Sequence, residues 1–103
     1  MNVSKCENIK TASITPEESM MVERSFYICD SYERFLSVLV REFANNPSDK
    51  TANMIEHYRV LYQNELVALK TKQNAIITSI VGKLYPDMSF EFDFSRYEVT
   101  IKW

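Results

Sequence analysis

The stretch Asn45-Asn46-Pro47-Ser48-Asp49 separates the two longest periodic segments of this 103-residue chain. Pro47 disfavours the helical conformation at Asn46, and Asn tolerates a left-handed backbone, so a helix that reaches this point must end. Ser48 or Asp49 can then cap a second helix, because the side-chain oxygen accepts a hydrogen bond from a backbone amide of the first turn. Since the connection is short, the two helices are predicted to be antiparallel neighbours.

The first helix is predicted over about residues 15–44 and begins at Thr15-Pro16-Glu17-Glu18. Thr15 and Glu18 have the spacing of a capping box, in which each side chain accepts a hydrogen bond from the backbone amide of the other residue. Pro16 suits the first helical position, because its missing N–H would have no partner inside the helix. Two apolar stripes with helical spacing follow: one is Ile28, Tyr32, Phe35 and Leu39, and the other is Val22, Phe26, Cys29, Leu36, Val40 and Phe43.

The second helix is predicted over about residues 48–85 and carries one long apolar face. Gly82 and Pro86 are its stop signals. The face consists of residues at helical spacing: Ile55, Tyr58, Tyr62, Leu66, Leu69, Ile76, Ile80 and Leu84.

After Pro86 the period of the apolar residues changes from about 3.6 to 2, which indicates strands. Phe90-Glu91-Phe92-Asp93-Phe94 and Tyr97–Trp103 alternate in this way, and they predict a β-hairpin over about residues 88–103. The joining segment has no Gly or Asn for a tight primed turn, so the turn type stays open. Residues 1–14 show no clean period and are expected to form a flexible or loosely docked arm. The fold class predicted is mainly α, with some β (α+β), in a single domain over residues 15–103.

The charge balance and hydropathy exclude several classes of partner. With 12 Lys and Arg against 14 Asp and Glu, the net charge is -2, which gives no general attraction to nucleic acid. No stretch approaches the roughly 18 consecutive apolar residues of a membrane-spanning helix. The first residues lack the pattern of a secretory signal, so we expect a cytoplasmic protein with reduced cysteines, Cys29 in the core and Cys6 exposed.

The residue types that carry chemistry are sparse. His57 is the single histidine and belongs to no metal-ligand pattern, and Gly82 is the single glycine, which excludes Gly-rich phosphate loops. The acidic residues Glu91, Asp93 and Glu98 are expected on the solvated face of the β-hairpin. The sequence therefore predicts no catalytic residue, no metal site and no cofactor, and the chain is expected not to be an enzyme.

The helices carry more apolar surface than two helices alone can bury. Either the β-hairpin covers the excess or a second copy does, in a four-helix arrangement of two hairpins. Tyr and other aromatic residues are favoured at interfaces, although core packing is the alternative interpretation for all of them. The candidate partner-interface residues are Tyr27, Tyr32, Phe35, Tyr58, Tyr62, Leu66 and Trp103.

Three segments carry a resemblance to a known family: Thr15-Pro16-Glu17-Glu18, Ser31-Tyr32-Glu33-Arg34-Phe35-Leu36, and Phe90-Glu91-Phe92-Asp93-Phe94 followed by Tyr97-Glu98-Val99. Their layout resembles the small accessory proteins of CXXX-repeat peptide modification systems, which accompany radical-SAM peptide maturases. A tryptophan that we would expect before the first strand in that family is missing here. The resemblance implies an accessory role and transfers no catalytic residue.

These observations predict a non-enzymatic protein–protein interaction module that acts as an accessory or regulatory subunit. Its partner would be a protein or peptide, with homo-oligomer formation through the helices. An alternative that fits the same features is a phage or mobile-element inhibitor that binds and occludes a host enzyme.

Overall fold

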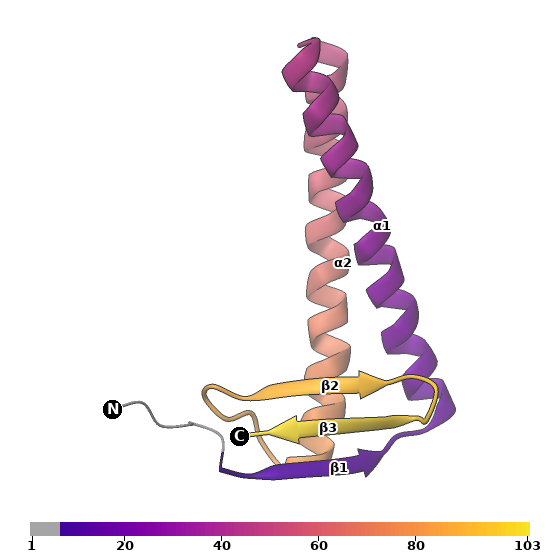
Figure 1. Ribbon diagram of the computed structural model, residues 1–103, viewed down its shortest axis with the longest axis vertical. Helices are drawn as coiled ribbons and strands as arrows, with labels where there is room; N and C mark the ends of the chain where they lie inside the picture. The colour runs from indigo at the N-terminus through magenta and orange to yellow at the C-terminus, as the bar shows by residue number, and fades with distance from the viewer. Residues whose placement is uncertain (1–6) are drawn as a thin grey trace. The chain divides into compact units, whose positions relative to one another are not determined.

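The computed structural model of the chain describes residues 7–103 and contains two long antiparallel helices that pack together and a small three-stranded antiparallel sheet (Figure 1). The predicted mainly helical α+β fold, a helical hairpin followed by a β-hairpin, is confirmed. The elements in chain order are β1 (Ile9–Ser13), α1 (Pro16–Asn45), α2 (Asp49–Val81), β2 (Ser89–Asp93) and β3 (Glu98–Lys102).

The predicted helix starts are confirmed by their capping hydrogen bonds. The amide of Thr15 donates to Oε1 of Glu18 at 2.9 Å, and the amide of Glu18 donates to Oγ1 of Thr15 at 3.0 Å. At the second helix the cap is Ser48, whose Oγ accepts from the amide of Thr51 at 3.1 Å. These bonds satisfy amides that have no partner inside the helix, and so they fix where each helix begins. Gly82, with φ of 92°, ends α2 in a left-handed conformation.

The prediction of a flexible arm over residues 1–14 is wrong for β1. This strand pairs antiparallel with β3 in a register that runs from Ile9 opposite Lys102 to Ser13 opposite Glu98. The ladder continues past the strand ends, where Asn8 and Trp103 exchange backbone hydrogen bonds of 2.8 and 3.0 Å. Because the strand's partner lies at the other end of the chain, nothing in the local pattern of β1 indicates the pairing. Residues 1–6, Cys6 included, lie outside the described part of the chain.

The sheet has the order β1-β3-β2, so β3 is the central strand. Val99 lies opposite Phe92, and Ile101 lies opposite Phe90. Since side chains alternate along a strand, these four residues share one face of the sheet. Val99 and Ile101 are completely buried on that face, whereas Lys102, on the opposite face, is exposed.

The turn between β2 and β3 is organised by a carboxylate. Oδ1 of Asp93 accepts hydrogen bonds from Ser95 Oγ at 2.8 Å and from the amides of Ser95 and Arg96, both at 3.1 Å. The bond from the Ser95 hydroxyl is the main cause that holds the pKa of Asp93 below its usual value. Tyr97 closes the turn in a left-handed conformation with φ of 54°. The Asp93 side chain thus stabilises a turn that lacks the usual Gly or Asn.

The chain forms two compact units. We call residues Arg24–Lys70 the hairpin unit, and described residues 7–23 together with Thr71–Trp103 the sheet unit. The buried side chains gather in the sheet unit: Ile14, Ser19, Val22, Ile76, Ile77, Val99 and Ile101. The hairpin unit buries only Ser25, Cys29, Leu39 and Leu69 to the same degree among described residues. The main hydrophobic core is therefore in the sheet unit, and Cys29 is buried as predicted.

Truncating the core of the sheet unit should be costly. We expect Ile77→Ala to lower the free energy of unfolding by about 2–5 kcal/mol, because Ile77 is fully buried and its loss leaves a cavity. The matched control is Thr78→Ala, an exposed neighbour on α2, which should change stability by less than about 0.5 kcal/mol. Urea unfolding followed by circular dichroism measures both variants, and equal losses would contradict this placement of the core.

Candidate interaction surface

Four of the candidate interface residues meet between the two helices of the hairpin unit. The ring of Tyr58 on α2 lies 4.8 Å from that of Phe35 in an edge-to-face geometry, and 6.3 Å from that of Tyr32. The hydroxyl of Tyr62 donates a long hydrogen bond of 3.3 Å to Oε2 of Glu33 on α1. These aromatic residues form the seam that holds α1 against α2.

The other candidate residues lie in different surroundings. Tyr27 is 56% exposed, with its ring edge-on to Phe26 at 5.6 Å between centroids. Leu66 is half-buried on α2. Trp103 belongs to the sheet unit, where it stacks on Tyr85 at 5.6 Å. The seven residues are divided between the two units, and their contact with a partner stays a prediction.

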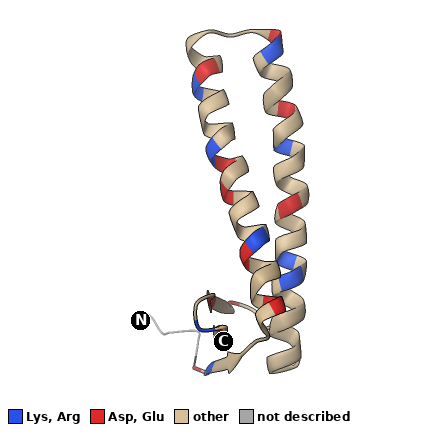
Figure 2. Cartoon of the chain, turned by 90° about the vertical axis from the view of Figure 1, so that its right-hand side faces the viewer, with Lys and Arg blue, Asp and Glu red and all other residues tan. Residues whose placement is uncertain are grey.

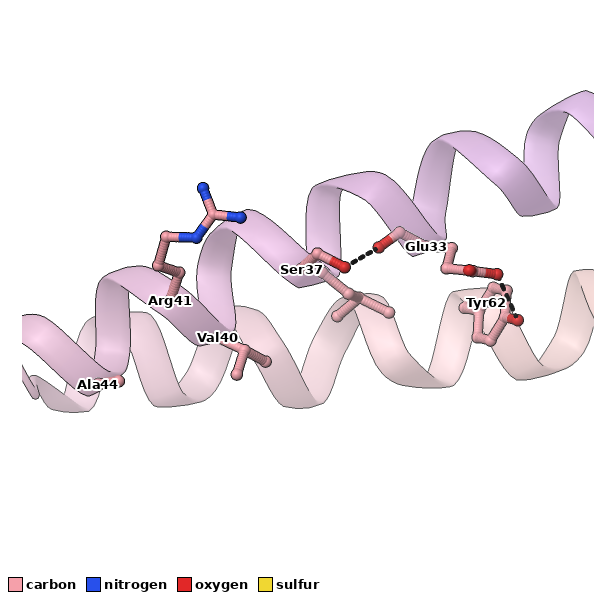
Figure 3. Close-up of a pocket in the computed structure, with 7 residues that line it drawn as sticks. Glu33, Ser37, Val40, Arg41, Ala44 and Tyr62 are labelled. Carbon is pink, nitrogen blue, oxygen red and sulfur yellow. Dashed lines mark hydrogen bonds between the residues drawn. The ribbon is translucent and has the colours of Figure 1, made fainter.

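A surface groove of about 450 Å³ opens along α1 of the hairpin unit (Figure 3). Leu36, Val40 and Ala44 supply its apolar lining, and Val40 is 54% exposed. The remaining lining residues are Glu33, Ser37, Arg41 and Tyr62. An exposed apolar strip with charged residues along it is typical of a surface that another protein covers.

The polar groups of the groove differ in how far they are already paired. Ser37 Oγ donates to the backbone carbonyl of Glu33 at 3.0 Å, so its hydroxyl is satisfied within its own helix. The side chain of Arg41 extends away from α2 in Figure 3, and it has no ion pair with any residue from 7 to 103. The groove therefore offers an unpaired cation at one end and a carboxylate at the other.

Charge is mixed over the hairpin unit, as Figure 2 shows, and the ion pairs between its described residues are local. Asp30 and Arg34 form one pair at 2.9 Å, and Glu56 and Arg59 form another at 2.8 Å. Both pairs connect neighbouring turns of one helix and are exposed, so each contributes little to stability.

Apolar side chains outside the groove are also exposed on the hairpin unit. A second surface groove, of about 530 Å³, is lined by Arg24, Tyr27, Ile28, Ser31 and Tyr32 on another flank of α1. Besides Val40, the exposed large hydrophobic residues of this unit are Phe26, Tyr27, Phe35, Val38, Phe43, Val60 and Val67. The apolar stripes thus exceed what the seam buries, and this excess supports a binding surface on this unit.

The sequence-based selection of aromatic residues missed most of the groove. Ser37, Arg41 and Ala44 are small or charged, and none attracts attention as a residue type. The signal that could have found them is spacing, because Glu33, Ser37 and Arg41 follow one another at intervals of four and so share one face of the helix.

Groups that could carry chemistry are scarce in residues 7–103. No set of three or more His, Cys, Asp or Glu side chains in this range could hold a metal ion. His57 is exposed, and its ring lies edge-on to Tyr58 at 5.0 Å. No helix in the same range is long and apolar enough to cross a membrane.

No family model, curated protein or solved structure matches this chain. The resemblance to accessory proteins of CXXX-repeat peptide modification systems therefore stays a prediction.

The hydrogen bond between Tyr62 and Glu33 leads to a prediction about the pKa of Tyr62. Partial burial, and then the charge of Glu33, raise the pKa of Tyr62, so the folded chain favours the neutral phenol. The raised pKa of Tyr62 therefore contributes to the free energy of unfolding at a pH below the pKa of an unfolded tyrosine. This contribution is lost as the pH rises through the higher pKa of the folded state. We expect Glu33→Gln to lower the pKa of Tyr62 towards its usual value.

Titration of tyrosinate absorbance measures this change. The variant Tyr62→Phe lacks the Tyr62 contribution, so the difference from the full chain identifies the signal of Tyr62. The matched control is Glu56→Gln, which removes an exposed carboxylate that is paired with Arg59 instead. An unchanged Tyr62 titration in Glu33→Gln would show that the two side chains do not interact.

Proposed function

We propose that this chain is a non-enzymatic protein–protein interaction module, an accessory or regulatory subunit that works in the cytoplasm. It binds a protein partner through the hairpin unit and also self-associates there. The observation that carries this proposal is the exposed apolar groove on α1, in which Val40 is 54% exposed beside Leu36 and Ala44.

Exposed apolar surface is costly in water, so covering it favours association. Burying a fully exposed Val or Leu side chain stabilises an assembly by about 1.5–3 kcal/mol. The eight large hydrophobic side chains of the hairpin unit are 37–64% exposed, so each one that a partner covers contributes roughly half of this amount before association entropy is subtracted. A long groove parallel to a helix suits the apolar face of another helix.

The resemblance noted in the sequence agrees with an accessory role, and nothing in the proposal requires a catalytic residue. An inhibitor that occludes a host enzyme would use the same groove. The identity of the captured partner separates these two roles, because an accessory subunit would be recovered with the enzyme that it assists and would leave that enzyme active.

Site-specific photo-cross-linking in the producing cell tests this function. A photoreactive phenylalanine analogue replaces Val40 in the groove, and the matched control replaces Asn64, an exposed polar residue of α2. We expect covalent adducts of defined mass from position 40 and few from position 64. The same adduct pattern at both positions, or no adduct at either, would contradict the proposal.

A further inference from the structure

We propose that a second copy of this chain occupies the groove, with the two α1 helices antiparallel and crossing at Ser37. This inference rests on the proposed function and deepens it by naming the partner and the register. Three features of the groove support this arrangement. Its charges are self-complementary, and the small side chain at its centre, Ser37, is hydrogen-bonded within its own helix. Its apolar lining includes the exposed Val40.

The charged residues of the groove are arranged so that two copies can pair. Glu33 and Arg41 both line the groove, and each lies four residues from Ser37, on opposite sides of it. In an antiparallel pair with a two-fold axis at Ser37, a residue four positions before the axis faces the residue four positions after it in the second copy. Glu33 would therefore face Arg41 of the second copy, and Arg41 would face Glu33 of the second copy. A two-fold interface requires such self-complementarity, because the same patch must bind itself.

Distance allows these pairs to form. Four residues along a helix span about 6 Å, so both charged residues remain close to the crossing point. Helices that cross at about 20° stay near each other over this length, and Glu and Arg side chains are long enough to bridge the remainder. Arg41 already extends away from α2 and is unpaired among residues 7–103 (Figure 3).

The centre of the groove permits close approach. Ser37 is small, and its hydroxyl already donates to the carbonyl of Glu33, so covering it leaves no unsatisfied donor. The exposed part of Val40 supplies apolar surface one turn away, and Ala44 extends it by a further turn. In such an interface the apolar contacts provide affinity, while the charge pairs at the rim fix the register and reject other partners.

Other surfaces of the chain fit a second copy less well. The second groove has Arg24 as its single charged lining residue, so when it pairs with itself no carboxylate of the groove faces that cation. The edge strand β2 carries Glu91 and Asp93, and antiparallel pairing of two β2 strands centred at Glu91 would place that carboxylate against its own copy. Of these surfaces, the α1 groove alone combines exposed apolar area with opposite charges related by a two-fold axis.

A charge-exchange experiment tests the register. Sedimentation equilibrium measures the dimer Kd of the full chain, of Glu33→Arg, of Arg41→Glu, of an equimolar mixture of the two, and of the double variant. Each single variant places like charges opposite one another twice, and we expect its Kd to rise about tenfold or more. In the mixture a heterodimer restores both pairs, and in the double variant the homodimer restores them.

The matched control is Glu56→Arg, a charge reversal at an exposed residue of α2 that does not line the groove, and it should leave the dimer Kd unchanged. Circular dichroism checks that each variant keeps its helices, which is expected because both charged residues are exposed. Dimers of unchanged Kd in all variants, or single variants that do not recover on mixing, would overturn the register. A chain that stays monomeric at every concentration, but cross-links another protein through position 40, would overturn this inference and the proposed self-association, and would leave the proposed binding of a protein partner intact.

Discussion

A pair of helices can bury only one face of each, and this limit decides how the chain distributes its apolar residues. In the hairpin unit Cys29, Leu39 and Leu69 are buried, and ring contacts among Tyr32, Phe35 and Tyr58 join α1 to α2. Eight large hydrophobic side chains of this unit stay exposed. In the sheet unit the strands add a further layer to the helices, so more than one face can be buried. Four side chains are completely buried there: Val22, Ile77, Val99 and Ile101. One chain thus contains a well-buried core and a helical surface that remains uncovered.

The helices could be predicted from sequence because their signals are local. The capping box at Thr15 and the break at Pro47 depend on residues within one turn, and the structure shows the hydrogen bonds that these residues imply. Strand β1 could not be predicted in this way. It is a short, mostly exposed strand whose partner, β3, lies at the other end of the chain, and the register of Ile9 opposite Lys102 exists only in the folded sheet.

The candidate site was predictable to a smaller extent, for a different physical reason. Residue type identifies Tyr32, Tyr58 and Tyr62 as suited to an interface, yet a tyrosine between two helices of one chain satisfies the same preference. The structure places these residues in the intramolecular seam, and it leaves Val40 exposed in a groove whose centre is Ser37. Small and charged residues determine the shape of that groove and the charges along it. They can be identified as lining residues only when the orientation of α1 towards α2 is known.

The central claim is that a second copy of this chain covers the exposed face of α1 in the hairpin unit. Amide hydrogen exchange over a series of protein concentrations tests it directly, because association slows exchange only where the helix is covered. We expect amides of residues 33–44 to gain protection as concentration rises, while those of β3 in the sheet unit keep the same protection. Protection that does not change with concentration, or that rises first along the edge of β1, would contradict the claim.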